Sequence, residues 1–130
     1  MQLQVVGLPN RLASGVKSAF MDIATSMQIQ FDEVPSYALL SQMAEPNTPY
    51  FYVEGPCDAE EDRVHLYHRV RAGFPLQFGR EVICSGDLLD AEDRIDWRSC
   101  QLSREEETAS TQNFRKRFKE FDFTLEDDDD

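Results

Sequence analysis

The chain has 130 residues and a formal net charge of -12, with 41% hydrophobic and 29% charged residues. This length suits one folded domain, and no apolar run is long enough to cross a bilayer or to act as a secretory signal. Because phosphates repel an acidic protein, the net charge by itself argues against nucleic-acid binding.

The N-terminal residues predict a strand followed by a helix. Residues 2–8 begin with alternating polar and apolar side chains before Pro9, which predicts a short strand at a sheet edge. A strand so close to the first residue is expected to need partners from an upstream segment. Ser14 can cap a helix whose apolar residues recur at helical spacing. These residues are Val16, Ala19, Phe20, Ile23, Ala24 and Met27.

A short strand and a short helix are expected next. Residues 31–34 are strand-like and end at Pro35. A helix is predicted after Ser36 and before Pro46, since the residue that precedes a proline disfavours the helical conformation. The side chains that this helix would bury are Leu39, Leu40 and Met43.

Two strands joined by a long loop are predicted in the middle of the chain. Residues 49–54 (PYFYVE) are rich in aromatic and β-branched side chains, and residues 64–70 (VHLYHRV) alternate in polarity. The residues between them contain Gly55-Pro56 and an acidic stretch, which together indicate a hairpin loop.

The C-terminal half predicts two helices. One is expected from about Pro75, although Gly79 weakens that prediction. The other begins after Ser103, which forms a capping box with Glu106 and precedes three glutamates that favour a helix N-terminus. Along this helix one face carries a stripe of phenyl rings, at Phe114, Phe118 and Phe121.

The predicted elements indicate an α+β fold, with a small, mostly antiparallel sheet flanked by helices and a long C-terminal helix. The domain is expected to span residues 1–125. Residues 126–130 are acidic and are predicted to form a disordered tail.

Two histidines in the second strand invite a metal-site interpretation. However, His65 and His68 are three residues apart, and side chains at that spacing in a strand point to opposite faces. His68 shares a face with Val64 and Leu66, so we expect a buried imidazole that is hydrogen-bonded to a neighbour. No metal site is predicted.

Catalytic constellations are not apparent. The three cysteines, Cys57, Cys84 and Cys100, form no C-x-x-C pair and have no activating base nearby, which favours reduced, unreactive thiols. No pair of carboxylates stands out, and glycine-rich phosphate loops are absent. We therefore expect neither an enzyme nor a bound cofactor.

Basic side chains nevertheless concentrate in two places. The first lies at the end of the second strand, where Arg69 and Arg71 precede the heptamer FPLQFGR, which ends at Arg80. Aromatic rings beside arginines suit base stacking and phosphate contact, so Phe78 and these arginines are candidates for binding RNA or a protein partner. The alternative is that Phe74 and Phe78 belong to the core and Arg80 pairs with a carboxylate. From the residues alone this alternative is favoured.

The second basic cluster lies in the last helix, where four cations occur within residues 115–119. Cations near a helix C-terminus are also favourable for the helix dipole, so a solvated face is the ordinary explanation. The alternative is that this cluster binds phosphate groups, and its candidate residues are Arg115, Lys116 and Arg117.

Several segments resemble the CwfJ C-terminus 2 family. The first is PYFYVE, and the second is HLYHRVRAGFPLQFGREVICS, in which a His-Arg strand runs into FPLQFGRE. RIDWRSCQLSREEE follows, and NFRKRFKEFDF matches the aromatic family ending. Residues 2–8 (QLQVVGL) are similar to the strand that joins this domain to its upstream neighbour, so the resemblance covers nearly the whole chain.

The resemblance implies a nuclear, splicing-associated protein. Family members associate with the late spliceosome and the released intron lariat, and some enhance the lariat debranching enzyme. In whole proteins a histidine-triad-like domain precedes this one, and one branch also has a metallophosphoesterase-like N-terminal domain. The ending at residues 121–125, followed by acids, is similar to that branch. Residues 1–9 are then expected to be the remnant of the joining strand.

Three functional hypotheses follow. The first is a non-catalytic binding module that contacts RNA or a spliceosomal protein, with Trp97 and the phenylalanine stripe holding the fold. The second is a part of a histidine-triad-like nucleotide hydrolase or transferase, with His65 or His68 taking part. The histidines of the upstream family domain are missing here, so no hydrolase chemistry is carried over. The third is a scaffold without RNA contact.

Overall fold

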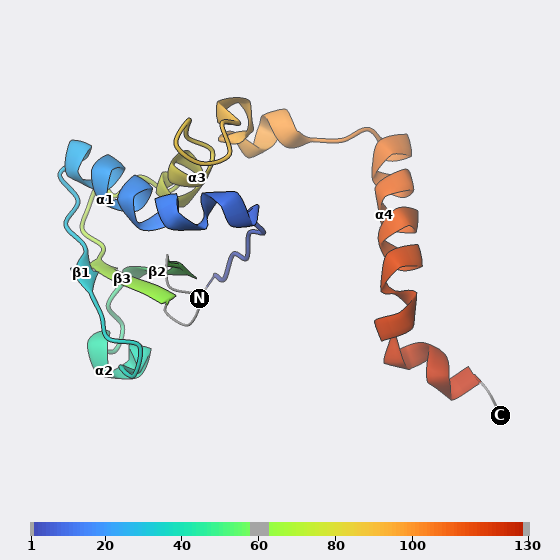
Figure 1. Ribbon diagram of the computed structural model, residues 1–130, viewed down its shortest axis with the longest axis horizontal. Helices are drawn as coiled ribbons and strands as arrows, with labels where there is room; N and C mark the ends of the chain where they lie inside the picture. Colours follow the sequence, from blue (N-terminus) through green and yellow to red (C-terminus); the bar gives the residue numbers. More distant parts are fainter. Residues whose placement is uncertain (1, 58–62, 129–130) are drawn as a thin grey trace. The chain divides into compact units, whose positions relative to one another are not determined.

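The computed structural model describes residues 2–57 and 63–128, and they form two compact units. Unit 1 is Met1–Asp96 and unit 2 is Trp97–Asp130. Unit 1 contains a three-stranded antiparallel sheet and three α-helices, and unit 2 contains the long helix α4, so the predicted α+β class is confirmed (Figure 1).

The sheet of unit 1 has the strand order β1-β3-β2. The strands are β1 (Asp32–Glu33), β2 (Tyr50–Pro56) and β3 (Arg63–Arg69), and β3 pairs antiparallel with both neighbours. Strands β2 and β3 lie where the sequence predicts them, although most of the predicted loop between them lies outside the described residues. The strand predicted at residues 31–34 is shorter than expected, since β1 comprises only two residues. Residues 2–9 form neither a helix nor a strand, so the predicted N-terminal strand is wrong.

Helix α1 (Val16–Ser26) covers one face of the sheet together with α3 (Phe78–Ile83). Both helices lie on one side of the sheet in Figure 1, whereas α2 lies on the other. The apolar spacing of α1 places Phe20 in the core, where it meets Phe78 and Phe31 edge to face. Ser14 does not cap α1, because the preceding 3-10 helix, η1 (Asn10–Gly15), already includes it.

The buried core of unit 1 joins α1, α3 and the inner face of the sheet. The core contains side chains from α1, from α3 and from the strands of the sheet. Leu66, Phe78 and Val82 are completely buried. Helix α2 (Leu40–Met43) is only one turn long, and Leu39 before it is exposed rather than buried as predicted. Lys17 of α1 forms an ion pair with Glu33 at the β1 edge.

Unit 2 contains one regular α-helix, which is preceded and followed along the chain by short 3-10 helices. They are η3 (Trp97–Cys100), η4 (Lys119–Phe121) and η5 (Phe123–Asp128), while α4 is Arg104–Phe118. The Ser103 hydroxyl accepts from the backbone amide of Glu106, 3.1 Å away, so the predicted cap is confirmed. Backbone residues 126–128 form part of η5 where disorder was predicted, and residues 129 and 130 lie outside the described residues.

Trp97 and the phenylalanine stripe do not form a buried core, contrary to prediction. Trp97 is 54% exposed, and the guanidinium of Arg98 lies 5.5 Å from its ring centroid. On α4 the rings of Phe114 and Phe118 stack at 5.6 Å, yet Phe114 remains 64% exposed. None of the described helices is both long and apolar enough to cross a bilayer.

Candidate functional site

The chain turns sharply after β3, and this turn positions two of the candidate arginines. The amide of Val70 still donates to the carbonyl of Pro49, so pairing with the β2 side continues past Arg69. The next four residues form a turn in which the amide of Phe74 donates to the carbonyl of Arg71, 3.2 Å away. Gly73 occupies this turn at φ +87°, a backbone conformation that glycine adopts without steric cost.

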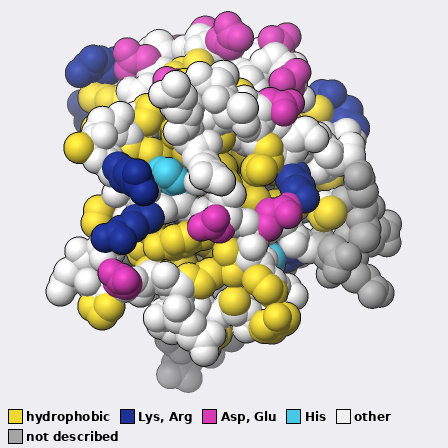
Figure 2. All heavy atoms as spheres, turned by 90° about the vertical axis from the view of Figure 1, so that its left-hand side faces the viewer, with side chains coloured by type: hydrophobic (Ala, Val, Ile, Leu, Met, Phe, Trp, Pro, Cys, Tyr) yellow, Lys and Arg dark blue, Asp and Glu magenta, His cyan; other side chains and the backbone are white. Residues whose placement is uncertain are grey.

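Arg69 and Arg71 are both exposed at the end of β3. We call this pair the β3-end arginines. Arg69 lies opposite Tyr50 in the β2–β3 register, on the sheet face away from α1 and α3. Figure 2 shows Lys and Arg side chains beside a histidine, on a face where hydrophobic side chains also reach the surface. The structure therefore keeps two of the three candidate arginines of this segment exposed at the end of β3.

Phe78 does not belong to that surface. Its side chain is 0% exposed, and its ring contacts those of Phe51 and Phe74 at centroid distances of 5.5 and 5.7 Å. The prediction that Phe78 contacts RNA or a partner is wrong, because the first turn of α3 directs the ring into the aromatic core. Phe74 is half-buried and packs against the same core. The core interpretation of the heptamer is thus correct for its phenylalanines.

Arg80 is half-buried, and its guanidinium is held by backbone carbonyls. Its Nε donates to the backbone carbonyl of Ile95 at 2.9 Å, and another guanidinium nitrogen donates to the carbonyl of Arg94 at 2.5 Å. A guanidinium held by two carbonyls is a structural link between α3 and the segment that precedes unit 2. The prediction that Arg80 contacts RNA or a partner therefore has to be corrected. Both of these bonds go to backbone carbonyls.

The two histidines of β3 lie on opposite faces of the sheet, as their spacing predicts. His68 faces the core side, where its Nδ1 lies 2.8 Å from the carbonyl of Gln30 and its ring stacks on Phe74 at 5.4 Å. Since a carbonyl only accepts, Nδ1 carries the proton. The predicted hydrogen bond of His68 is confirmed, although the ring is half-buried rather than fully buried.

His65 occupies the opposite face and pairs with a tyrosine. The hydroxyl of Tyr52 lies 2.6 Å from His65 Nδ1. Desolvation by burial, with a smaller contribution from the charge of Glu54, raises the pKa of Tyr52, so its phenol stays protonated at neutral pH. Among the described residues, no group of three or more His, Cys, Asp or Glu side chains is arranged to hold a metal ion.

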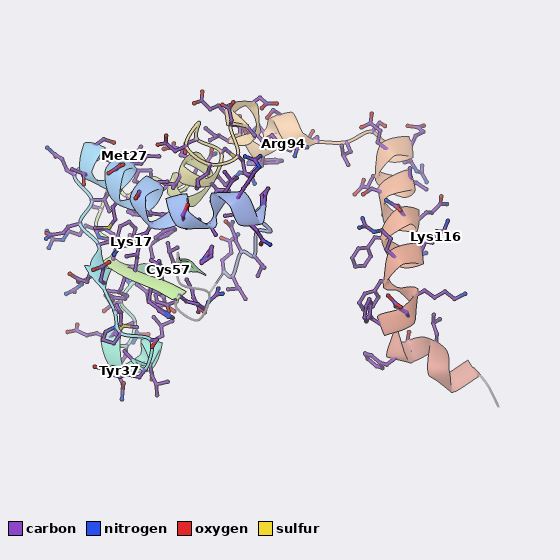
Figure 3. All side chains as sticks on the ribbon, viewed as in Figure 1. Lys17, Met27, Tyr37, Cys57, Arg94 and Lys116 are labelled. Atoms are coloured by element: carbon purple, nitrogen blue, oxygen red, sulfur yellow. The ribbon has the colours of Figure 1, made fainter. Side chains whose placement is uncertain are left out.

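The α4 cations lie in unit 2 and form a second candidate surface. Arg115, Lys116 and Arg117 are all exposed in the last turn of α4. Figure 3 shows Lys116 on the side of α4 away from the row of aromatic rings. Arg117 instead lines a shallow, open depression together with Phe114, Phe118 and Phe121. A cation thus borders the apolar stripe on this helix.

Sequence reasoning overlooked the aromatic character of the outer sheet face, meaning the face away from α1 and α3. Tyr50 and Tyr52 of β2 face outward together with Tyr67 of β3, and Tyr52 lies directly opposite Tyr67. The rings of Tyr50 and Tyr67 stack at 5.9 Å. Alternation in PYFYVE was the signal that could have shown this, because residues two apart in a strand share a face.

Comparison with known proteins places these features in a family. Residues 24–124 match the family model described as "Protein similar to CwfJ C-terminus 2". The chain belongs to this family. The match includes the β3-end arginines, the FPLQFGR segment and α4.

Relatives from animals and plants align along most of the chain. CWF19-like protein 1 from Homo sapiens is 43% identical over 129 residues, which cover 98% of this chain and 23% of the relative. The CWF19-like protein 1 homolog from Caenorhabditis elegans is 36% identical over 130 residues, or 100% of this chain and 24% of the relative. Zinc finger CCCH domain-containing protein 59 from Oryza sativa is 38% identical over 129 residues, which cover 92% of this chain and 20% of the relative. The chain spans about a quarter or less of these relatives.

Proposed function

We propose that this chain is a non-catalytic binding module of a splicing-associated nuclear protein, acting at the late, intron-lariat stage of pre-mRNA splicing. Membership in the CwfJ C-terminus 2 family supports the link to splicing. The proposed ligands are RNA and proteins of the spliceosome, among them the lariat debranching enzyme. In this proposal the module brings its partners together and favours debranching without doing chemistry itself.

The exposure of the β3-end arginines is the observation that supports RNA contact. Both guanidiniums lie at the surface, and Glu54, towards the other end of β2, is paired with Arg63 at 2.8 Å. Two arginines separated by one residue at a turn can reach neighbouring phosphates of a nucleic-acid backbone. This local arrangement opposes the repulsion expected from the overall charge of -12.

The experiment is a filter-binding series at increasing salt, with single-stranded and branched RNA as probes. The double change Arg69→Ala and Arg71→Ala should weaken binding and lower the slope of log affinity against log salt by about 0.7 for each phosphate that is no longer bound. The matched control is Arg11→Ala with Arg104→Ala, which removes the same charge from exposed positions elsewhere.

An unchanged affinity and salt slope in the Arg69/Arg71 variant would reject RNA contact by this pair. An equal loss in the Arg11/Arg104 control would show that net charge, rather than position, governs binding. A stable complex with spliceosomal proteins in the absence of any RNA affinity would instead support the scaffold hypothesis.

The α4 cations are proposed as a second contact within the same function. Arg117 borders exposed phenyl rings, so this surface combines charge with apolar area. Crosslinking mass spectrometry on purified lariat spliceosomes should find Lys116 and Lys119 linked to a partner. Crosslinks confined to Lys17, the one remaining lysine of the sequence, would contradict a role for α4 in partner binding.

A further inference from the structure

The outer face of the sheet combines stacked aromatic rings with an arginine. Tyr50 and Tyr67 stack with 5.9 Å between centroids and 27° between planes, and Tyr52 and His65 lie 6.2 Å apart at 38°. Tyr50, Tyr52 and His65 are only half-buried, whereas Tyr67 is 9% exposed beneath them. The two pairs therefore form one layer of rings whose outer members keep part of their surface open.

This layer is held in place by the sheet itself. The strand register sets Tyr52 opposite Tyr67 and Glu54 opposite His65, so neighbouring rings are separated by the fixed spacing between strands. The hydroxyl of Tyr52 is further tied to His65 Nδ1 at 2.6 Å. Rings that are already oriented lose little conformational entropy when a flat ligand stacks on them.

The charges around the layer favour an anionic ligand on its β2–β3 side. Arg69 lies opposite Tyr50 at one end of the layer. At the other end Glu54 is bound to Arg63 at 2.8 Å, which offsets its negative charge. Asp32 stands on the β1 side, opposite Tyr67, and marks the border beyond which an anion is disfavoured.

From these observations we propose that the outer sheet face binds single-stranded RNA, with unpaired bases stacked on Tyr50 and Tyr52 and the backbone contacted by Arg69. Every base has a π face, so stacking tolerates any sequence, whereas the bases of a duplex are already stacked on each other. This inference rests on the proposed RNA contact, but it assigns affinity to the rings and not to charge alone.

Photocrosslinking tests the contact directly on the full chain. The probe is a single-stranded RNA of about 12 nucleotides carrying 5-bromouridine, a length within the usual range for such surfaces. Irradiation should link it to the peptide that contains Tyr50 and Tyr52. Tyr37 is the internal control, because it is 85% exposed and belongs to the α2 region rather than to the ring layer (Figure 3).

Affinity measurements separate stacking from charge. The double variant Tyr50→Leu and Tyr52→Leu should bind the same RNA at least about fivefold more weakly, with an unchanged salt slope. Tyr37→Leu, at an exposed position outside the ring layer, should bind like the unaltered chain. Circular dichroism checks that the leucine variants fold, and the crosslink of the unaltered chain tests stacking even if they do not.

Three outcomes overturn the inference. Tyrosine variants that bind normally while the Arg69/Arg71 variant fails would leave the proposed function standing and remove the stacking surface. Equally tight binding of a duplex of the same sequence would show that bases are not read by stacking. Loss of a protein partner, with RNA affinity intact, would show that the face is a protein interface.

Discussion

The guanidinium of Arg80 donates a hydrogen bond to the backbone carbonyl of Ile95, 2.9 Å away and 15 residues further along the chain. A second bond from the same side chain reaches the carbonyl of Arg94. Because α3 also provides the fully buried Phe78, one short helix both fills the core and anchors the end of unit 1. The FPLQFGR segment is therefore a structural element of the fold.

Replacing Arg80 with lysine should destabilise unit 1 without weakening the proposed RNA contact. A single ammonium cannot reproduce the planar fork that serves both carbonyls, so at least one backbone acceptor loses its charged donor. We expect the free energy of unfolding to fall by about 1–3 kcal/mol. Urea denaturation measures the change, and Arg71→Lys is the control that should leave stability unaltered. Normal stability of the Arg80→Lys variant would contradict the anchoring role.

Substitution of Gly73 tests the turn that positions the β3-end arginines. An added Cβ meets no atom within 4 Å, so only the positive φ of +87° opposes alanine at this position. We expect Gly73→Ala to lower the free energy of unfolding by about 1–2 kcal/mol. Gly7→Ala is the matched control, since its Cβ also meets no atom and its φ is not in the left-handed region. Equal thermal stability of the two variants would show that the turn carries no such strain.

The raised pKa of Tyr52 should make the stability of the folded chain depend on alkaline pH. Burial raises the pKa of Tyr52, so between its unfolded value of about 10 and its higher folded value the folded state holds the proton more tightly. The folded state then binds more protons than the unfolded state, and stability must fall as the pH rises through this window. Urea midpoints measured from pH 8 upward should decline above about pH 10.

Tyr52→Phe provides the control for this alkaline window, because it removes the titrating phenol and keeps the ring. Its stability should decline less steeply above about pH 10 than that of the unaltered chain. Lys17 also has a raised pKa, caused first by its hydrogen bond to Glu33, and it contributes in both proteins. Identical pH profiles would therefore show that Tyr52 does not titrate differently in the folded state.

Ser103→Ala should shorten or loosen α4. The variant removes the oxygen that accepts the Glu106 amide, and loss of such a cap costs about 1 kcal/mol of helix stability. Hydrogen exchange of the first-turn amides of α4 should become faster by roughly fivefold. Ser110→Ala, at an exposed position within α4, should not accelerate that exchange. Unchanged protection in Ser103→Ala would mean that the cap does not hold the helix start.

Local pattern was enough to predict most of the secondary structure. The alternation in residues 64–70 predicts β3 and separates His65 from His68, because a strand must place residues three apart on opposite faces. The Ser103 cap likewise predicts the start of α4, since a side chain bonds an amide only three residues away. Family membership followed from segments of the sequence as well. Each of these features depends on neighbours in the chain.

Only the tertiary structure decided which aromatic and cationic side chains stay at the surface. Phe78 and Arg80 belong to the same segment as Arg71, yet packing against α1 and β2 buries the ring, and the carbonyl of Ile95 engages the guanidinium. The stacking of Tyr50 on Tyr67 depends on the register between β2 and β3. Burial and pairing depend on residues distant in sequence. Spacing along the chain could therefore predict that aromatic and basic side chains gather near β3, but not which of them stay exposed.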